Sequence, residues 1–288
     1  MIRALMLGRL GNNLFQYAFA RTLAERHGVP VLMSGAWFNR PTWRYVEPMG
    51  MLPAFTDGRS RLTRAHSIPA RLLRKIAGRH PWELMGKPVV RERENDHTFD
   101  PSLTKAPADC ILYGYFQSPL YFQSIAPILR AELRTDGLGL ECGHEDDAAQ
   151  LRSPSAIAVH VRRTDYLRNR DVTQCSEGYY RRAMERSRER VRNARFHIFS
   201  DDPDWCARTF TDDDCAVAGC GDPFRPLVDL HLMSLAGHHI IANSSYSWWA
   251  AWLGEKPDQH VMMPDSWFQS GIAAPIEEKK LAHWEIVS

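Results

Sequence analysis

Residues 1–33 read MIRALMLGRLGNNLFQYAFARTLAERHGVPVLM, and this opening already indicates a fold class. The apolar run 2–7 predicts a strand that leads into a tight glycine turn. Over residues 14–27 the apolar side chains recur at helical spacing, and Gly28 suits the left-handed C-cap that ends many helices. Residues 29–33 predict a second strand. Strand, tight turn, helix and strand in this order are the opening of a Rossmann-like domain.

The same alternation continues along the chain and is clearer in the second half. Strands are predicted at residues 111–116, 156–161, 196–200 and 239–242 and, as the last of them, 261–263, and helices at 119–133, 179–191, 227–235 and 245–253. This pattern favours parallel sheets covered on both faces. The polar, glycine-bearing segment 135–154 is the candidate boundary. We therefore expect an α/β protein with two Rossmann-like domains, residues 1–140 and 150–288, facing each other across a cleft.

The composition narrows the class of protein. The chain has 288 residues, of which 44% are hydrophobic, and a net charge of +2, which argues against a general nucleic-acid binder. The six cysteines are irregularly spaced, which indicates reduced thiols in a reducing compartment. The first residues lack the apolar core of a signal peptide, and no run approaches the roughly 18 apolar residues of a membrane span. We expect a cytoplasmic protein.

The segment 59–93 is strongly basic. Its apolar residues near 68–76 predict one short amphipathic helix. Two interpretations stay open: a helix with a solvated basic face, or a helix that docks peripherally on an anionic membrane surface, at the inner face of the membrane.

Two adjacent arginines follow the predicted strand 156–161, in His160-Val161-Arg162-Arg163-Thr164-Asp165-Tyr166. Ligands in open α/β sheets bind at the carboxyl ends of strands. A pyrophosphate there would give the arginines a partner, because guanidinium groups bind phosphate oxygens through two parallel hydrogen bonds. In the alternative, Arg163 pairs with Asp165 and Arg162 faces water.

The next predicted strand ends in Ser200-Asp201-Asp202. The carboxylate of Asp201 could accept the N1 and N2 protons of guanine. Asp202-Pro203-Asp204 also has the D-x-D form with which metal-dependent glycosyltransferases hold manganese and a nucleotide sugar. Against a metal, Pro203 and Asp204 also fit the first turn of a short helix.

A third polar segment, ANSSYSWW at residues 242–249, follows the strand at 239–242. Asn243 or Ser244 can cap the next helix, whose first amides would then be available to an anion. Trp248, Trp249 and Trp252 are expected to fill the core. In the first half, the turn from Gly8 to Asn12 could bring backbone close to a phosphate or a sugar.

Taken together, these segments resemble the α-1,2-fucosyltransferase family. The matching pieces are GRLGNNLFQYAFARTLA near the start, GYFQSPLYF at 114–122, HVRRTDY at 160–166, FSDDPDW at 199–205 and DLHLMSLAGHHIIANSSYSWWAAWL at 229–253. They run in the family's order, and residues 40–105 are largely unmatched. HVRRTD is shared with α-1,6- and protein O-fucosyltransferases, which implies a common donor site. The resemblance implies a GT-B fold, an inverting reaction and GDP-fucose as donor.

The resemblance also implies roles for individual residues. Those expected to bind the donor are Arg162 at the pyrophosphate with Arg163 beside it, His160 and Asp201 at the guanosine end, Ser244 and Ser245 at the phosphates, and Gly11 and Asn12 from the other domain. One departure is Asn13, where the family usually carries glutamine, and it bears on the acceptor side.

We expect direct displacement, in which the acceptor hydroxyl attacks the fucose anomeric carbon and GDP leaves from the opposite face. Arg162, Asp165 and Asn12 are the candidate catalytic residues, with Asp165 as the nearest carboxylate for a general base. No metal or other cofactor is expected. The resemblance favours an acceptor that ends in galactose, as an oligosaccharide or a lipid-linked glycan. Two rivals stay open: a metal-dependent glycosyltransferase that uses the D-x-D site, and a non-catalytic sugar- or nucleotide-binding module.

Overall fold

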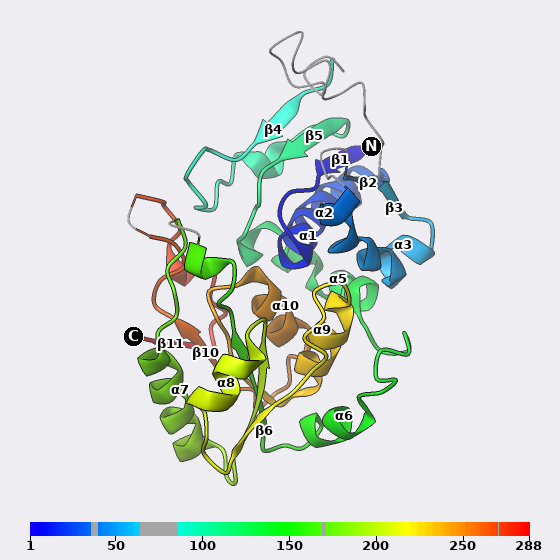
Figure 1. The fold of residues 1–288 in the computed structure, drawn as a ribbon. Coiled ribbons are helices and arrows are strands. Elements are labelled where there is room, and N and C mark those ends of the chain that lie inside the picture. The colour runs from blue at the N-terminus through cyan, green and yellow to red at the C-terminus, as the bar shows by residue number, and fades with distance from the viewer. Residues whose placement is uncertain (36–39, 64–85, 169–170, 270) are drawn as a thin grey trace. The chain divides into compact units, whose positions relative to one another are not determined.

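A computed structural model describes residues 1–35, 40–63, 86–168, 171–269 and 271–288 (Figure 1). Contacts within the chain separate it into two compact units, Met1–Arg134 and Thr135–Ser288. The helix expected near residues 68–76 lies outside the described residues.

The first unit is built on a parallel five-stranded sheet of order β3-β2-β1-β5-β4. Its strands are β1 Ile2–Leu5, β2 Val31–Ser34, β3 Ser60–Thr63, β4 Val89–Arg91 and β5 Cys110–Tyr113. Its helices are α1 Leu10–His27, α2 Arg40–Arg44, α3 Pro53–Thr56 and α5 Ala126–Leu133, with 3-10 turns η1 Glu47–Met51, η3 Leu103–Lys105, η4 Pro119–Tyr121 and η5 Gln123–Ile125. The strand order reverses between β1 and β5, so the carboxyl ends of these two strands flank the topological switch point of the sheet.

The second unit is built on a parallel six-stranded sheet of order β11-β10-β9-β6-β7-β8. Its strands are β6 Ala156–Val161, β7 Arg195–Ser200, β8 Cys215–Val217, β9 His238–Ile240, β10 Val261–Pro264 and β11 Trp284–Val287. Its helices are α6 Glu145–Leu151, α7 Glu177–Arg190, α8 Pro203–Thr209, α9 Pro226–Leu235 and α10 Ser245–Leu253, with 3-10 turns η6 Tyr166–Arg168 and η7 Ile276–Glu278. Read from β8, this order is that of the Rossmann fold, with its switch point between β6 and β9.

The burial of their side chains explains why β6 and α10 lie in the core of the second unit. All six residues of β6 are buried, as expected for a central parallel strand covered on both faces. On α10, Trp248 and Trp249 are 1% and 0% exposed, so they fill the core as expected. The indole nitrogen of Trp248 donates to the carbonyl oxygen of Lys279 at 2.6 Å, which satisfies its one polar atom.

Helix α1 is buried on more than one side, so its polar residues need partners inside the unit. Arg21 pairs through Nε with Glu132 of α5 at 3.0 Å and through Nη1 with Glu25 at 2.6 Å. The hydroxyl of Tyr17 donates to Glu132 at 2.7 Å and lies 3.2 Å from the hydroxyl of Ser60 on β3. Burial, and after it the charge of Glu132, raises the pKa of Tyr17 far above its usual value. This network ties α1 to α5 and to the sheet.

The expected α/β class is confirmed, and the chain forms two parallel sheets. The expectation of one helix over residues 119–133 is wrong: two 3-10 turns precede α5, which carries Pro127 in its first turn. Proline has no backbone N–H and therefore cannot continue a helix from the preceding turn. The expectation that the last strand is 261–263 is also wrong, because β11 follows it. No described helix combines the length and the apolar character that crossing a membrane requires.

We predict that Glu132→Gln destabilises the protein far more than Glu25→Gln. Both carboxylates pair with Arg21, but the Glu132 side chain is 8% exposed and the Glu25 side chain 48% exposed. Loss of a buried partner leaves an uncompensated charge and costs about 3–5 kcal/mol, whereas an exposed pair contributes about 0–1 kcal/mol. Urea unfolding of the two variants measures the difference. Equal losses in the two variants would contradict this account of the buried network.

Candidate functional site

The switch point of the second sheet gathers most of the residues singled out from the sequence. Residues 162–166 follow β6 and residues 241–245 follow β9, the two strands that flank the switch point. The strand β7, beside β6, ends at Ser200 and is followed by Asp201. Carboxyl ends of neighbouring parallel strands meet at one edge of a sheet, where ligands of open α/β sheets bind. This edge of the second unit is therefore the candidate site.

Arg162 is held between two carboxylates. Its Nη2 lies 2.7 Å from Oδ2 of Asp165, and its Nη1 lies 3.2 Å from Oδ2 of Asp201. Burial lowers its pKa, but the pairs with Asp165 and Asp201 outweigh burial and raise the pKa overall, so the guanidinium stays charged. The alternative in which Arg163 pairs with Asp165 and Arg162 faces water is wrong, because Arg162 takes Asp165 and its side chain is only 17% exposed.

Arg163 has a different partner. Its Nε pairs with Oδ2 of Asp202 at 3.1 Å, and its guanidinium lies 3.8 Å from the centre of the Trp205 ring. The other oxygen of Asp202 accepts from the Trp205 amide at 3.2 Å, which makes Asp202 the N-cap of α8. The D-x-D segment thus forms a capped helix start, in which Asp204 is an exposed residue of the first turn. Both oxygens of Asp202 are engaged by its own chain.

Asp201 holds the loop that carries the arginines. Its Oδ1 accepts from the Arg163 amide at 2.9 Å, and its Oδ2 accepts from the Thr164 amide at 3.2 Å and from the Thr164 hydroxyl. With the Arg162 pair included, both carboxylate oxygens are occupied by the 162–164 loop. In the structure, Asp201 therefore holds the 162–164 loop in place. Its contact with guanine stays a prediction.

His160, the residue before the last of β6, is a buried, neutral side chain. It is 5% exposed, and burial, followed by the charge of Arg162, lowers its pKa to about 3. Its Nδ1 is buried and has no hydrogen-bond partner among the described residues. The ring lies 5.6 Å from that of Tyr246, in the first turn of α10. A buried nitrogen without a partner is costly, and a ligand at this edge would supply one.

The start of α10 faces the same switch point. Ser244 is the N-cap, and its hydroxyl accepts from the Tyr246 amide at 3.4 Å, whereas Asn243 does not cap the helix. The Asn243 side chain instead donates to the carbonyl oxygens of Trp267, at 2.9 Å, and of Thr173. The first amides of α10, from Ser245 onward, make a helix start that suits an anion.

Three further side chains hold these loops, and the sequence alone gave them no role. The Tyr166 hydroxyl donates to the carbonyl oxygen of Asn243 at 3.2 Å, and the Tyr246 hydroxyl donates to that of Pro226 at 2.5 Å. The half-buried Asp229 accepts from the amide of Cys220 at 2.7 Å and from that of Gly221 at 3.2 Å. Their partners are backbone groups, which the sequence does not identify, so only the folded chain shows these roles.

Gly11 and Asn12 belong to the first unit, where both lie in the first turn of α1 rather than in the preceding turn. The turn residue Gly8 has φ +71°, and a Cβ atom there would lie 2.2 Å from Nδ2 of Asn12. Asn13 is fully buried, and its Nδ2 donates to the carbonyl oxygen of Arg9 at 2.7 Å. The asparagine that departs from the family pattern thus braces the glycine turn.

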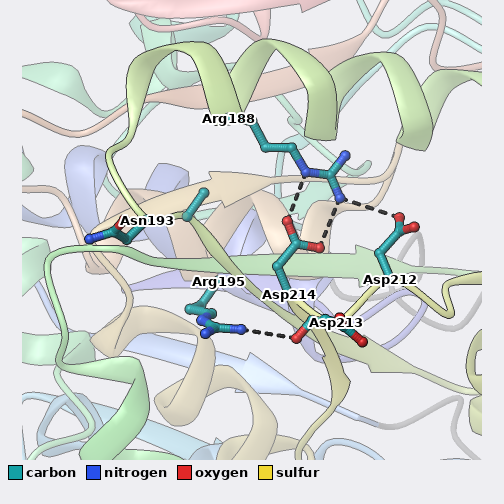
Figure 2. Close-up of a pocket in the computed structure, with 7 residues that line it drawn as sticks. Arg188, Asn193, Arg195, Asp212, Asp213 and Asp214 are labelled. Carbon is teal, nitrogen blue, oxygen red and sulfur yellow. Dashed lines mark hydrogen bonds and ion pairs between the residues drawn. The ribbon is translucent and has the colours of Figure 1, made fainter.

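An open pocket of about 710 Å³ lies elsewhere in the second unit (Figure 2). Arg188 lines it and pairs with Asp214 at 2.8 Å and with Asp212 at 3.3 Å. These aspartates precede β8, so the pocket lies at the amino edge of the sheet, opposite the switch-point loops. Burial, and then Asp214, raises the pKa of the neighbouring Cys215 thiol to about 12, so this sulfur is no thiolate. Three of the charged side chains that line this pocket are thus already paired with one another.

Comparison with known proteins places the chain in a family. The profile of glycosyl transferase family 11 matches residues 92–288. An alpha-1,2-colitosyltransferase of Escherichia coli is 33% identical over 166 residues, which are 54% of this chain and 55% of that protein. The O-antigen biosynthesis glycosyltransferase WbnK of Escherichia coli is 27% identical over 91% of this chain and 93% of its own. The galactoside alpha-(1,2)-fucosyltransferase 1 of Rattus norvegicus is 26% identical over 82% of this chain and 69% of its own.

A solved structure gives an independent comparison of the fold. The fucosyltransferase NodZ from Bradyrhizobium superposes with a TM-score of 0.52, covering 86% of this chain and 91% of NodZ. Its sequence is 13% identical, so this likeness concerns the fold alone, which is of the GT-B type.

We predict that Asp201→Asn loosens the arginine loop. An amide has one acceptor oxygen where the carboxylate has two, and it cannot neutralise Arg162. The backbone amides of Arg163 and Thr164 should then exchange with deuterium about tenfold faster, the effect of losing one hydrogen bond. Hydrogen exchange measured by NMR tests this, with the exposed Asp204→Asn, in the first turn of α8, as the control. Unchanged protection of both amides would remove Asp201 from this role.

Proposed function

Because this chain belongs to glycosyl transferase family 11, we propose that it is a galactoside 2-α-L-fucosyltransferase. In this reaction fucose moves from GDP-fucose to O2 of a terminal galactose of a glycan, with inversion at the anomeric carbon. The observation that carries the proposal is the second unit's switch point, where Arg162, neutral His160 and the start of α10 lie together. These groups suit a diphosphate, since they offer a guanidinium fork and backbone amides.

The chemical difficulty is the negative charge that builds on the phosphate as GDP leaves. Preorganised positive groups aimed at that charge contribute most to such a reaction. We assign this task to Arg162 and to the amides that begin α10 at Ser244 and Ser245. Arg163, stacked on Trp205, completes the donor site. The resident pairs of Arg162 fix its guanidinium in place before the donor arrives.

We assign Asp165 as the general base. In the structure its Oδ2 pairs with Arg162. A diphosphate that binds Arg162 competes with this pair and can release the carboxylate toward the acceptor hydroxyl. The same event that binds the donor therefore prepares the group that accepts the proton of the acceptor hydroxyl. We also assign Gly11 to donor binding and Asn12 to catalysis, as the family resemblance implies.

The similarity to a colitosyltransferase supports a second candidate donor. Colitose is fucose without its 3-hydroxyl, so GDP-colitose would use the same diphosphate-binding groups. The acceptor as a lipid-linked glycan, peripheral contact with a membrane and a cytoplasmic location are also proposals, which rest on the sequence features described above.

The proposal is tested by incubating the protein with a panel of galactosides in millimolar EDTA, with GDP-fucose and GDP-colitose as donors in parallel. We expect an α-1,2-fucosyl product, identified by linkage analysis, at a rate that EDTA leaves nearly unchanged, because we assign the neutralisation of the leaving group to Arg162 and the start of α10 and not to a metal. Activity that is lost in EDTA and restored by manganese would favour the D-x-D alternative. Binding of GDP without any transfer would favour a non-catalytic module.

We predict that Arg162→Lys separates charge from geometry. Lysine keeps one positive charge but replaces a planar fork with a single flexible ammonium. If the fork stabilises the departing diphosphate, kcat should fall about 100-fold, as on loss of one preorganised donor, and KM for GDP-fucose should change less. The exposed Arg192→Lys is the matched control, and melting temperatures report folding. A folded Arg162→Lys variant within a few-fold of wild-type kcat would show that another group stabilises the leaving GDP.

A further inference from the structure

Two side-chain amides meet at the switch point of the first sheet. Gln117 follows β5, and Asn12 lies in the first turn of α1, which follows β1. Nε2 of Gln117 donates to Oδ1 of Asn12 at 2.7 Å. Gln117 is only 7% exposed. The pair thus connects the two strand ends that flank the switch point, which is where ligands of such sheets bind.

An unfavourable backbone conformation directly precedes Gln117. The preceding residue, Phe116, has φ +52°, a left-handed value that is rare for a bulky side chain. Buried Glu92 accepts from the amide of Tyr115 at 2.7 Å and from that of Phe116 at 3.1 Å, and so holds the turn in this shape. A Cβ on Gly114 would lie 2.5 Å from the Cβ of Glu92, so only glycine lets the two segments approach. Strain maintained by surrounding structure is typical of functional positions.

The Asn12 side of the pair is braced as well. Gln16 accepts from the Leu7 amide at 3.1 Å and donates to the carbonyl oxygen of Gly114 at 2.8 Å, so one side chain links the ends of β1 and β5. On the Asn12 amide, the hydrogen bond from Gln117 holds the oxygen, while Nδ2 lies against Gly8. Without this bond, the two ends of the amide could exchange places, because they have the same shape.

We propose that Gln117 is the positioning residue for Asn12 and that Asn12, held in this orientation by Gln117, binds a sugar hydroxyl at the first unit's switch point. Amides donate to and accept from hydroxyls and carry no charge, so they suit a neutral sugar ring better than a phosphate. The proposal rests on the proposed function, since the sugar is either the fucosyl group of the donor or the galactose of the acceptor.

A double-mutant cycle tests whether Gln117 acts through Asn12. The variants are Asn12→Ala, Gln117→Met and the double variant, compared by kcat/KM. Gln117→Met should lose about tenfold, as on loss of one hydrogen bond, and Asn12→Ala should lose more. If Gln117 acts only by orienting Asn12, the double variant should be no worse than Asn12→Ala alone. Multiplying losses, or wild-type kcat/KM in a folded Gln117→Met variant, would overturn the proposal.

The kinetic constants identify the source of the hydroxyl. A rise in KM for the galactoside points to the acceptor. A rise in KM for GDP-fucose, with unchanged calorimetric affinity for GDP, points to the fucosyl group of the donor. If Gln117→Met does not fold, the isosteric Gln117→Glu replaces it in the cycle, with the exposed Gln123→Glu as the control for added charge.

Failure of the proposed function has its own signature. If wild-type protein transfers no sugar, the function fails, and the same cycle is then measured as binding of lactose and of GDP-fucose by saturation-transfer NMR. Weaker binding of one of these sugars in both single variants, with no further loss in the double variant, supports the amide pair. Wild-type binding of both sugars in Asn12→Ala and Gln117→Met overturns it.

Discussion

The candidate site depends on the hydrogen bonds that the carboxylate of Asp201 accepts from the loop after β6. The segment after β6 has no regular structure of its own, yet it must hold a guanidinium that is mostly removed from water. Asp201 fixes that segment by accepting from two successive amides and from the Thr164 hydroxyl, and it pairs with Arg162 in addition. Because Asp201 stands at the end of β7, the register of β6 against β7 sets where the arginines lie.

The charges around this loop nearly balance before any ligand binds. Arg162 and Arg163 face Asp165, Asp201 and Asp202, and His160 adds no charge because burial keeps it neutral. An arriving diphosphate would therefore compete with carboxylates for the guanidinium groups instead of meeting bare positive charge. Such competition favours a ligand whose oxygens match the fork of the guanidinium group over a simple anion. Only well-placed hydrogen bonds offset the free energy lost when the carboxylate pairs are displaced.

The sequence predicted the fold class and the positions of the polar strand ends. Both follow from the spacing of apolar residues, which marks where strands and helices begin and end. The partners of those polar residues could not be predicted. Asp201 and Glu92 bind backbone amides, and the sequence does not show which amide comes within reach. Strands of three or four residues, such as β8 and β11, are too short for a clear period-two pattern. The left-handed turn at Phe116 also has no sequence signal, because a phenylalanine there runs against local preference.

The tryptophans of α10 give the second unit a built-in optical reporter. Trp248 and Trp249 pack edge to face, with ring centres 5.2 Å apart, on the helix whose first amides face the candidate site. An anion that binds at the start of a helix changes the electric field along that helix, and indole emission shifts with the local field. We therefore expect an anion at this helix start to shift the emission of these two indoles, against the background of the other seven tryptophans of the chain.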